Sequence, residues 1–421
     1  MKKVIALLLV AVMTVAPLSV FSGCSQSRSE ILKIRNVGEY MDEEIFAEFE
    51  DWYYEQTGKR VTVEASEFIT LEQLVTEIEI DQADYDLICP SEYAVEQMIK
   101  KDLLLKVDKS IIDVNGTNEN GDPLFKQQYL DILKDADPTL EYAIPYLFGT
   151  FGIMYDKSKT GEHIDSWEAI YSGEYNGKSY VKKCSTKKSL REAFISVNIY
   201  NNREALRIAS KNWTDYNTSE YRELLASIYD QPDDDVIASV KNTLVNTKKI
   251  ITKWDEEDVK FTMSSGNTSI EVALVWSCDA GYVMNDYEDN NGNEQHGNHN
   301  LWYAIPREGG NVYVDNFVIP KYAKNVEAAN YFLKFLCQEH IAVANSWYSG
   351  SISPVTSAYD SLKEEYEADE DGMFEGTEEG WKEMFIDMMF PNEQTLARCG
   401  VMRDYGDKER AVATMWSQVV E

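Results

Sequence analysis

Strand-like and helical segments alternate along the first hundred residues, and this alternation limits the possible folds more than any other feature of the sequence. Apolar residues recur with a period of two in the strand-like segments and at helical spacing in the others. In chain order the segments are 31–37, 42–54, 60–65, 70–80, 84–90 and 92–101. Strands joined by helices at this spacing indicate βαβ units, so the sequence predicts an α/β fold with a mostly parallel sheet.

The alternation continues less regularly after Gly149. Further strands are expected at 152–155, 269–276 and 313–320, and further helices at 167–171, 191–199, 328–337 and 409–419. An open α/β sheet binds its ligand at the carboxyl ends of its strands. The segments that follow strands are therefore the first places to look for a site, namely 36–40, 90–93, 276–279 and the start of the strand that holds Asp315.

Composition and charge exclude several classes of protein. The 421 residues are enough for two or three domains, and 12% aromatic residues are too many for a disordered chain. The 73 acidic residues outnumber the 40 basic ones, which gives a formal charge of -33. Such a surface repels nucleic acid and anionic lipid and attracts cations. The charge favours a cationic ligand, although acidity can also serve solubility alone.

The N-terminus has the features of an export signal. Lys2 and Lys3 precede an apolar stretch, residues 4–16, which is too short to span a membrane comfortably. Small residues then lead to Cys24, and this junction resembles the lipobox of bacterial lipoproteins, with Phe21 where Leu is usual. We predict a lipoprotein signal peptide over 1–23, lipidation at Cys24 and a polar tether over 24–30. An ordinary secretory signal cut nearby is the alternative.

No metal or catalytic constellation is recognisable in the sequence. Five cysteines follow Cys24 without a CxxC or Cys/His zinc pattern, so small buried thiols with at most one disulfide are expected. His296 and His299 lie in a polar run that is more typical of a solvated loop than of a ligand set. Motifs of nucleophilic, zinc-dependent or nucleotide-dependent enzymes are absent. The sequence therefore predicts no metal, no cofactor and no enzymatic activity.

Five motifs occur in order over nearly the whole mature chain, and together they resemble the spermidine/putrescine-binding family, the polyamine-binding proteins of ABC importers. They are Asn36-Val37-Gly38-Glu39-Tyr40, Tyr85-Asp86-Leu87-Ile88-Cys89-Pro90-Ser91-Glu92-Tyr93, Ile144-Pro145-Tyr146-Leu147-Phe148-Gly149-Thr150-Phe151-Gly152, Asp315-Asn316-Phe317-Val318-Ile319-Pro320-Lys321 and Arg403-Asp404-Tyr405-Gly406. The resemblance implies a two-lobe, periplasmic-binding-protein-like fold of type II, with hinge crossings and a ligand cleft. Lobe 1 would comprise 31–147 and 315–354, and lobe 2 would comprise 148–314 and 355–421. The chain would cross between the lobes near Phe148, Val314 and Pro354.

The resemblance also implies the residues of the site. A polyamine needs carboxylates at the spacing of its amines and aromatic faces along its methylenes. Asp315 would take an inner amine and Glu192 a terminal amine. The remaining candidates would line the walls or lie near the pocket, namely Glu39, Tyr40, Ser91, Tyr93, Trp276, Tyr313 and Arg403. Structural alternatives stay open, because Ser91 and Asp279 suit helix N-caps, Tyr93 and Trp276 suit core packing, and Glu192 suits an exposed helix.

Several positions depart from the pattern of the family, and one of them is Gly38, which replaces a hydroxyl residue or another side chain. Val37 replaces an aromatic residue, Ser189 a second carboxylate and Ser351 a pocket tyrosine, while Arg403 falls near a pocket glutamine. The loss of one carboxylate and the gain of a cation fit a short diamine, or a ligand with its own carboxylate, better than a long triamine.

The sequence therefore predicts an extracytoplasmic solute-binding component of an ABC importer, anchored to the cell membrane by lipid. Its partners would be a polyamine-like cation, such as putrescine or spermidine, and the permease and ATPase subunits. A binding protein for another small amine or an amino-acid-like ligand is the first alternative. An extracellular enzyme and a surface adhesion protein are less favoured, because neither explains the ordered cleft motifs. The sequence does not distinguish one polyamine from another.

Overall fold

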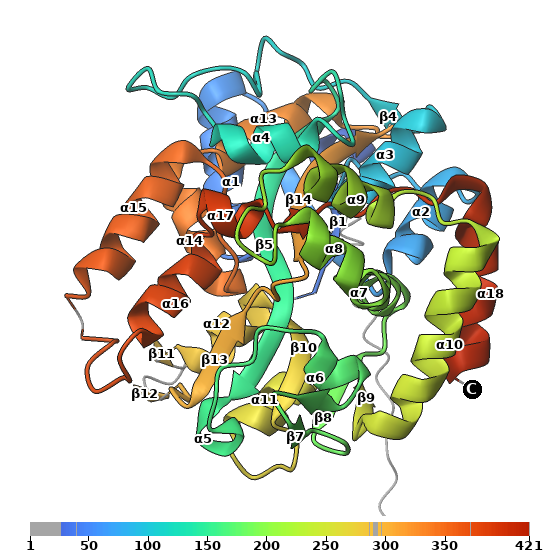
Figure 1. Cartoon of the computed structure of the whole chain (residues 1–421). Coiled ribbons are helices and arrows are strands. Elements are labelled where there is room, and N and C mark those ends of the chain that lie inside the picture. The colour runs from blue at the N-terminus through green and yellow to red at the C-terminus, as the bar shows by residue number, and fades with distance from the viewer. Residues whose placement is uncertain are drawn as a thin grey trace, which may run out of the picture.

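Two long antiparallel strands run side by side through the centre of the molecule (Figure 1). The computed structural model describes residues 27–420 except 39, 286, 289–293, 296 and 371, so the predicted signal peptide and Cys24 lie outside the described residues. The central strands are β5 (Ala143–Asp156) and β14 (Gly310–Pro320). Every residue of both strands is buried, which explains their nearly continuous apolar sequences.

Parallel strands flank this central pair on both sides. One side has the order β2 (Thr62–Phe68), β1 (Ile31–Val37) and β3 (Leu87–Ile88), with β3 next to β14. The other side has β10 (Val272–Trp276), β8 (Cys184–Lys187) and β9 (Lys253–Asp255), with β10 antiparallel to β5. The predicted α/β architecture with parallel strands is confirmed, and the antiparallel pairs are concentrated around β5 and β14.

Shorter strands complete the sheets. The strands β4 (Leu104–Leu105) and β15 (Cys399–Gly400) pair with β14, and β13 (Leu301–Ala304) pairs with β5. Two small hairpins lie apart, β6 (Glu174–Tyr175) with β7 (Lys178–Ser179) and β11 (Tyr287–Glu288) with β12 (Glu294–Gln295).

Helices cover the sheet and supply most of the surface. In chain order they are α1 (Ile45–Thr57), α2 (Leu71–Glu79), α3 (Glu92–Lys100), α4 (Gln127–Leu133), α5 (Lys157–Thr160), α6 (Glu168–Tyr171), α7 (Leu190–Asn201), α8 (Arg203–Ala209), α9 (Ser219–Tyr229), α10 (Asp234–Ile250), α11 (Val259–Ser264), α12 (Ser277–Met284), α13 (Val326–Leu336), α14 (Glu339–Ser349), α15 (Thr356–Ala368), α16 (Trp381–Met389), α17 (Glu393–Leu396) and α18 (Glu409–Val420). The helices α10 and α18 lie side by side (Figure 1). No helix of the described part of the chain is long and apolar enough to cross a membrane.

The three segments predicted to cross between lobes meet at Phe148. This residue pairs with Val314 of β14 and, through an isolated bridge, with Ile352. Gly149 follows, and the ring of Tyr313 packs directly on it. A Cβ atom at this position would lie only 2.4 Å from the phenolic oxygen. The glycine is therefore required by this close approach.

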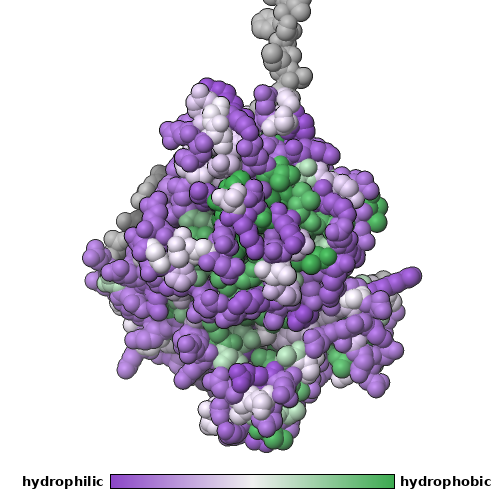
Figure 2. All heavy atoms as spheres, turned by 90° about the horizontal axis from the view of Figure 1, so that it is seen from above, coloured by the Kyte–Doolittle hydropathy of each residue, from purple (hydrophilic) through white to green (hydrophobic). Residues whose placement is uncertain are grey.

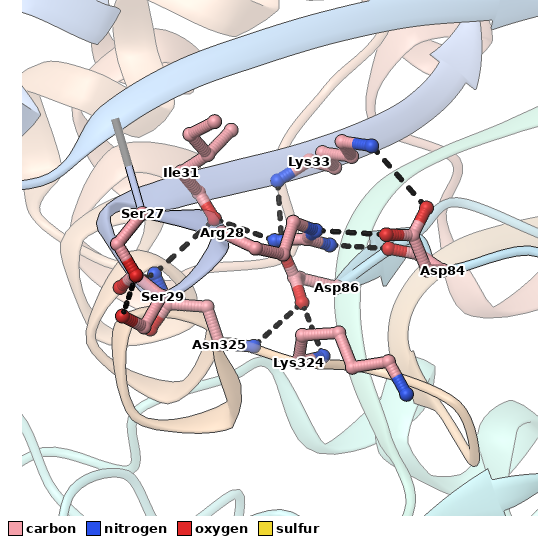
Figure 3. A network of polar contacts seen from close by, with 9 residues as sticks. All are labelled: Ser27, Arg28, Ser29, Ile31, Lys33, Asp84, Asp86, Lys324 and Asn325. Atoms are coloured by element: carbon pink, nitrogen blue, oxygen red, sulfur yellow. Dashed lines mark hydrogen bonds and ion pairs between the residues drawn. The ribbon is translucent and has the colours of Figure 1, made fainter. Parts of the chain in front are cut away.

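The start of the described chain is bonded to the body of the protein (Figure 3). The Arg28 guanidinium forms ion pairs with Asp84 and with Asp86. Asp86 is fully buried, and it also accepts hydrogen bonds from the backbone amides of Lys324 and Asn325, both at 2.7 Å. This network ties β1 to the segment before β3 and to the segment after β14.

The polarity of the surface and the state of the cysteines both agree with what the composition predicts. Figure 2 shows a face that is predominantly hydrophilic, with hydrophobic residues gathered toward its middle. The cysteines that follow Cys24 are all unpaired thiols, which confirms the expectation of at most one disulfide; they are Cys89, Cys184, Cys278, Cys337 and Cys399.

Candidate ligand site

Asp315 lies at a bulge of β14, where the pairing with β5 shifts between Asp315 and Asn316. Its carboxylate accepts one hydrogen bond from the Tyr40 hydroxyl at 2.7 Å and one from the Ser91 hydroxyl at 2.5 Å. The residue is only 8% exposed, and in the described residues no lysine or arginine forms an ion pair with it. Burial raises the pKa of Asp315, although the two hydroxyl groups lower it in part. The carboxylate is thus held by neutral donors and lacks a counter-ion.

Ser91 has the backbone position of an N-cap of α3, yet its side chain makes no capping bond. The hydroxyl group donates to Asp315 instead, and the backbones of the two residues form an isolated bridge. The alternative in which Ser91 caps the helix through its side chain is therefore wrong. Ser91, at the start of α3, thus donates its hydroxyl hydrogen to Asp315 of β14, which is 224 residues away in the chain.

Aromatic rings stand next to this carboxylate. Trp276 and Tyr313 meet edge to face with ring centroids 5.0 Å apart, and Trp276 also contacts Phe151. The Tyr313 hydroxyl lies 3.6 Å from the sulfur of Cys278 and 3.5 Å from the Ser351 hydroxyl. Trp276 is only partly buried, as expected for a ring that borders a site and also packs on the sheet.

Glu92 was passed over in the sequence, although it stands within the motif that contains Ser91. The residue is 1% exposed, and its Oε2 atom accepts a hydrogen bond from the Val314 amide at 3.2 Å. Burial is the main reason that the pKa of Glu92 rises to about 8, and the charge of Asp315 adds to this effect. An acidic residue at the start of a helix that follows a buried strand was the signal that could have identified it.

Tyr93 belongs to a second cluster, centred on Arg191 of α7. The Arg191 guanidinium lies 3.7 Å from the centroid of the Tyr93 ring and 4.5 Å from that of Tyr405. It also pairs with Glu409 and donates to the Arg403 carbonyl at 3.0 Å. A buried cation thus covers the predicted ligand-facing ring.

The Arg403 side chain points to α3. Its guanidinium forms two hydrogen bonds with the Glu96 carboxylate, at 2.9 and 3.1 Å. In the described part of the chain no hydrogen bond or ion pair joins Arg403 to Asp315. Arg403 therefore belongs with the Arg191 cluster.

Glu192 is half-buried on α7 and accepts a hydrogen bond from the Ser189 hydroxyl. Burial raises the pKa of Glu192, while Ser189 and the nearby charge of Lys187 oppose the rise. Among the described residues, no hydrogen bond or ion pair joins Glu192 to Asp315. Glu39, another predicted site residue, lies outside the described residues.

Lys187 is a fully enclosed cation that the sequence did not indicate. Its ammonium group lies 2.5 Å from Glu257, 3.2 Å from Asp279 and 3.3 Å from Asp255. Asp279 also pairs with Lys260 at 2.5 Å, so its carboxylate binds two lysines and is not an N-cap. These ion pairs join β8, β9, α11 and α12 behind the end of β10.

Comparison with known proteins gives consistent matches over most of the chain. Residues 44–375 match the family described as bacterial extracellular solute-binding protein. A putrescine/agmatine-binding protein of Pseudomonas aeruginosa is 26% identical over 305 residues, which cover 71% of this chain and 72% of that protein. A putrescine/cadaverine-binding protein of the same organism is 25% identical over 408 residues, covering 95% and 97%. The solved spermidine/putrescine ABC transporter substrate-binding protein of Streptococcus pneumoniae aligns with a TM-score of 0.63 at 22% identity, over 93% of this chain and 98% of that chain.

Proposed function

The chain belongs to the family of bacterial extracellular solute-binding proteins, and from this premise we propose that it binds a polyamine-like cation for an ABC importer. Its place is extracytoplasmic, and its fold is the two-lobe α/β fold of its structural neighbours. The relatives named for putrescine, agmatine and cadaverine support a diamine as the ligand. That the chain catalyses no reaction stays a prediction.

The buried carboxylate of Asp315 is the observation that carries this proposal. A carboxylate held by two hydroxyl groups and bordered by aromatic rings is a site for an ammonium group. The opposite charge would come from the ligand, because an unpaired buried charge is costly. Tyr40, Ser91, Trp276 and Tyr313 would form the wall around this ammonium.

The remaining predicted residues enter the proposal at a distance from Asp315. We place Glu192 at the other end of a diamine and Tyr93 beside it, since Arg191 ties Tyr93 to the helix that carries Glu192. Arg403 would contribute indirectly, since its backbone carbonyl binds Arg191 and its guanidinium pairs with Glu96. Glu39 completes the set as a prediction.

The lobes, the hinge and the anchor are further parts of the proposal. Lobe 1 (31–147 and 315–354) and lobe 2 (148–314 and 355–421) would close around the ligand. The pairing of Phe148 with Val314 and with Ile352 supports a hinge at these crossings. Lipidation at Cys24 would hold the protein at the outer face of the membrane, beside its permease and ATPase partners.

A ligand with its own carboxylate is the second candidate. It is favoured by Ser189, which stands where the family often has a second carboxylate, so that the Glu192 end of the cleft carries less negative charge. An amino-acid-like cation would then place its ammonium at Asp315.

A thermal-shift panel tests the two candidates. Putrescine, cadaverine, agmatine and spermidine are compared with basic and zwitterionic amino acids on the mature chain. A ligand at a hundred times its Kd should add about 2.7 kcal/mol to the free energy of unfolding. A shift with diamines and none with amino acids supports the first candidate, the reverse supports the second, and no shift with any amine contradicts both.

A further inference from the structure

Glu92 places a second buried carboxyl group beside Asp315. The residue follows Ser91, whose hydroxyl donates to Asp315, and its Oε2 atom is bonded to the amide of Val314, which precedes Asp315 in β14. Two separate contacts therefore hold the start of α3 against two consecutive residues of β14, Val314 and Asp315. Glu92 is 1% exposed, so water does not solvate its carboxyl group.

The other oxygen of Glu92 has no partner. Its Oε1 atom is buried and makes no hydrogen bond among the described residues. Buried carboxyl oxygens are normally bonded, so this exception needs an explanation, and a donor brought by a ligand is one. Arg191 is the cation whose charge lowers the pKa of Glu92. Its guanidinium, however, is already bonded to Glu409 and to the carbonyl of Arg403.

We infer that Glu92 and Asp315 together receive one ammonium group of the ligand, and that Glu92 releases its proton to water when that ammonium enters. The inference rests on the proposed function. The charges balance, because one cation enters as one proton leaves the neutral acid. The ligand class is a primary amine that carries its charge at neutral pH, and Glu92 is the residue that couples its binding to pH.

The sign of the pH dependence follows from the charges around Glu92. Without a ligand, burial and Asp315 raise its pKa to about 8, so the group is mostly neutral at pH 7. A bound ammonium favours the carboxylate and lowers this pKa. Affinity should therefore rise with pH up to about 8 and then level off.

The other groups that face Glu92 keep one state over this range. Arg191 stays charged, because the pKa of its guanidinium is raised above an already high value. The Tyr93 phenol stays neutral, because burial raises its pKa well above 10. Burial raises the pKa of Asp315 from its usual value of 3.8, and that carboxyl group adds a pH dependence of its own.

Calorimetric titration of the mature chain with putrescine tests the inference. Titrations at pH 7 in buffers of different ionisation enthalpy should reveal proton release, which disappears at pH 9. Affinity of the parent should rise about twenty-fivefold between pH 6.5 and 8.5 if the pKa of free Glu92 is about 8. Glu92→Gln keeps the size of the side chain but should abolish the release and flatten this profile. Binding of putrescine without proton release, or an unchanged profile in Glu92→Gln, overturns the inference.

Glu308 offers a matched control. Its carboxyl group is also 1% exposed, and burial raises its pKa to about 7, but it is bonded to Ser166 and to the Trp167 amide, away from Asp315. Glu308→Gln should leave both the proton release and the affinity unchanged. An equal loss of release in this variant also overturns the role of Glu92.

A measurement on the parent protein covers the case in which Glu92→Gln does not fold. Infrared difference spectra with and without putrescine should show the loss of a protonated carboxyl band on binding at pH 7. A bound complex without this loss contradicts the inference and leaves the proposed function standing. If no amine binds the parent protein at all, the proposed function fails and the inference fails with it.

Discussion

At the scale of single residues, the neighbours of Asp315 decide what its carboxylate can do. Hydroxyl groups from Tyr40 and Ser91 orient both of its oxygens without neutralising the charge. A lysine in the same place would have formed an internal ion pair and closed the site to cations. The Lys187 cluster shows that alternative, since its carboxylates are already paired with an internal ammonium.

Replacing Asp315 by Asn should weaken amine binding by about thirtyfold or more. The substitution keeps the shape and removes the charge, and truncation of one partner in a buried charge pair costs roughly 2–5 kcal/mol. Glu192→Gln should lose less, since Glu192 is more exposed and closer to the end of the ligand. Calorimetry on both variants measures the two losses, with circular dichroism to confirm folding. Parent-like affinity in Asp315→Asn would mean that this residue is structural.

At the scale of elements, β5 and β14 carry both the proposed crossing between lobes and the proposed site. They bring Gly149 opposite Tyr313 in register, and two residues further along β5, Phe151 pairs with Trp276 at the end of β10. The aromatic wall is therefore a consequence of strand pairing. The wall depends on Gly149 of β5, because a residue without a side chain leaves room there for the Tyr313 ring.

Gly149→Ala should destabilise the protein by about 1–3 kcal/mol, because the added Cβ would overlap the buried ring of Tyr313. Urea unfolding measures the loss, and amine affinity should fall as the ring moves. Gly281→Ala is the control, since a Cβ there meets the flexible end of Met389 at 3.1 Å in a helix that favours alanine. Equal stability of Gly149→Ala and the parent would show that the ring can shift at no cost.

Lys187→Met should destabilise the junction of β8, β9 and α12 by about 3–5 kcal/mol, because it leaves buried carboxylates without their cation. Its neighbour Lys188 pairs with Glu256 at the surface, so Lys188→Met should cost at most about 1 kcal/mol. Chemical unfolding of both variants in the same buffer makes the comparison. Similar losses in the two variants would contradict the importance of burial at Lys187.

At the scale of the whole molecule, the site lies where distant parts of the chain meet. Asp315 is reached by Tyr40 and Ser91 from more than two hundred residues away, and the crossings at Phe148, Val314 and Ile352 converge beside it. Motion at these crossings would change access to the carboxylate. The strongly acidic body would also draw cations toward the protein before they reach the cleft.

The radius of gyration should fall when ligand binds, because closure of two lobes makes the molecule more compact. Small-angle X-ray scattering with and without saturating putrescine measures the change. Asp315→Asn is the control, at a putrescine concentration that fills the parent but stays below the weakened Kd of the variant, since mostly empty sites should keep the open value. An identical radius in the parent with and without bound ligand would count against closure and leave the ligand assignment unaffected.

Much of the secondary structure followed from the sequence, because periodicity is a property of each segment alone. The strand at Ile31–Val37 and the helices at Leu71–Glu79 and Glu92–Lys100 lie within two residues of their predicted bounds. No helix was predicted for 203–250 or 339–389, although α10 buries Ile237, Val240, Leu244 and Thr247 at helical spacing. Its polar composition hid that period.

The sequence by itself determined the α/β class and the resemblance to a solute-binding family, and it singled out Asp315 as a predicted ligand residue. Only the tertiary structure decided that Glu92 bonds to the strand that carries Asp315, that Arg191 covers Tyr93 and that Lys187 is enclosed by carboxylates. The physical reason is distance along the chain. Glu92 and Val314 are 222 residues apart, and no local pattern can report a contact that forms when α3 packs against β14. Burial, which sets the charge state of each of these groups, exists only after that packing.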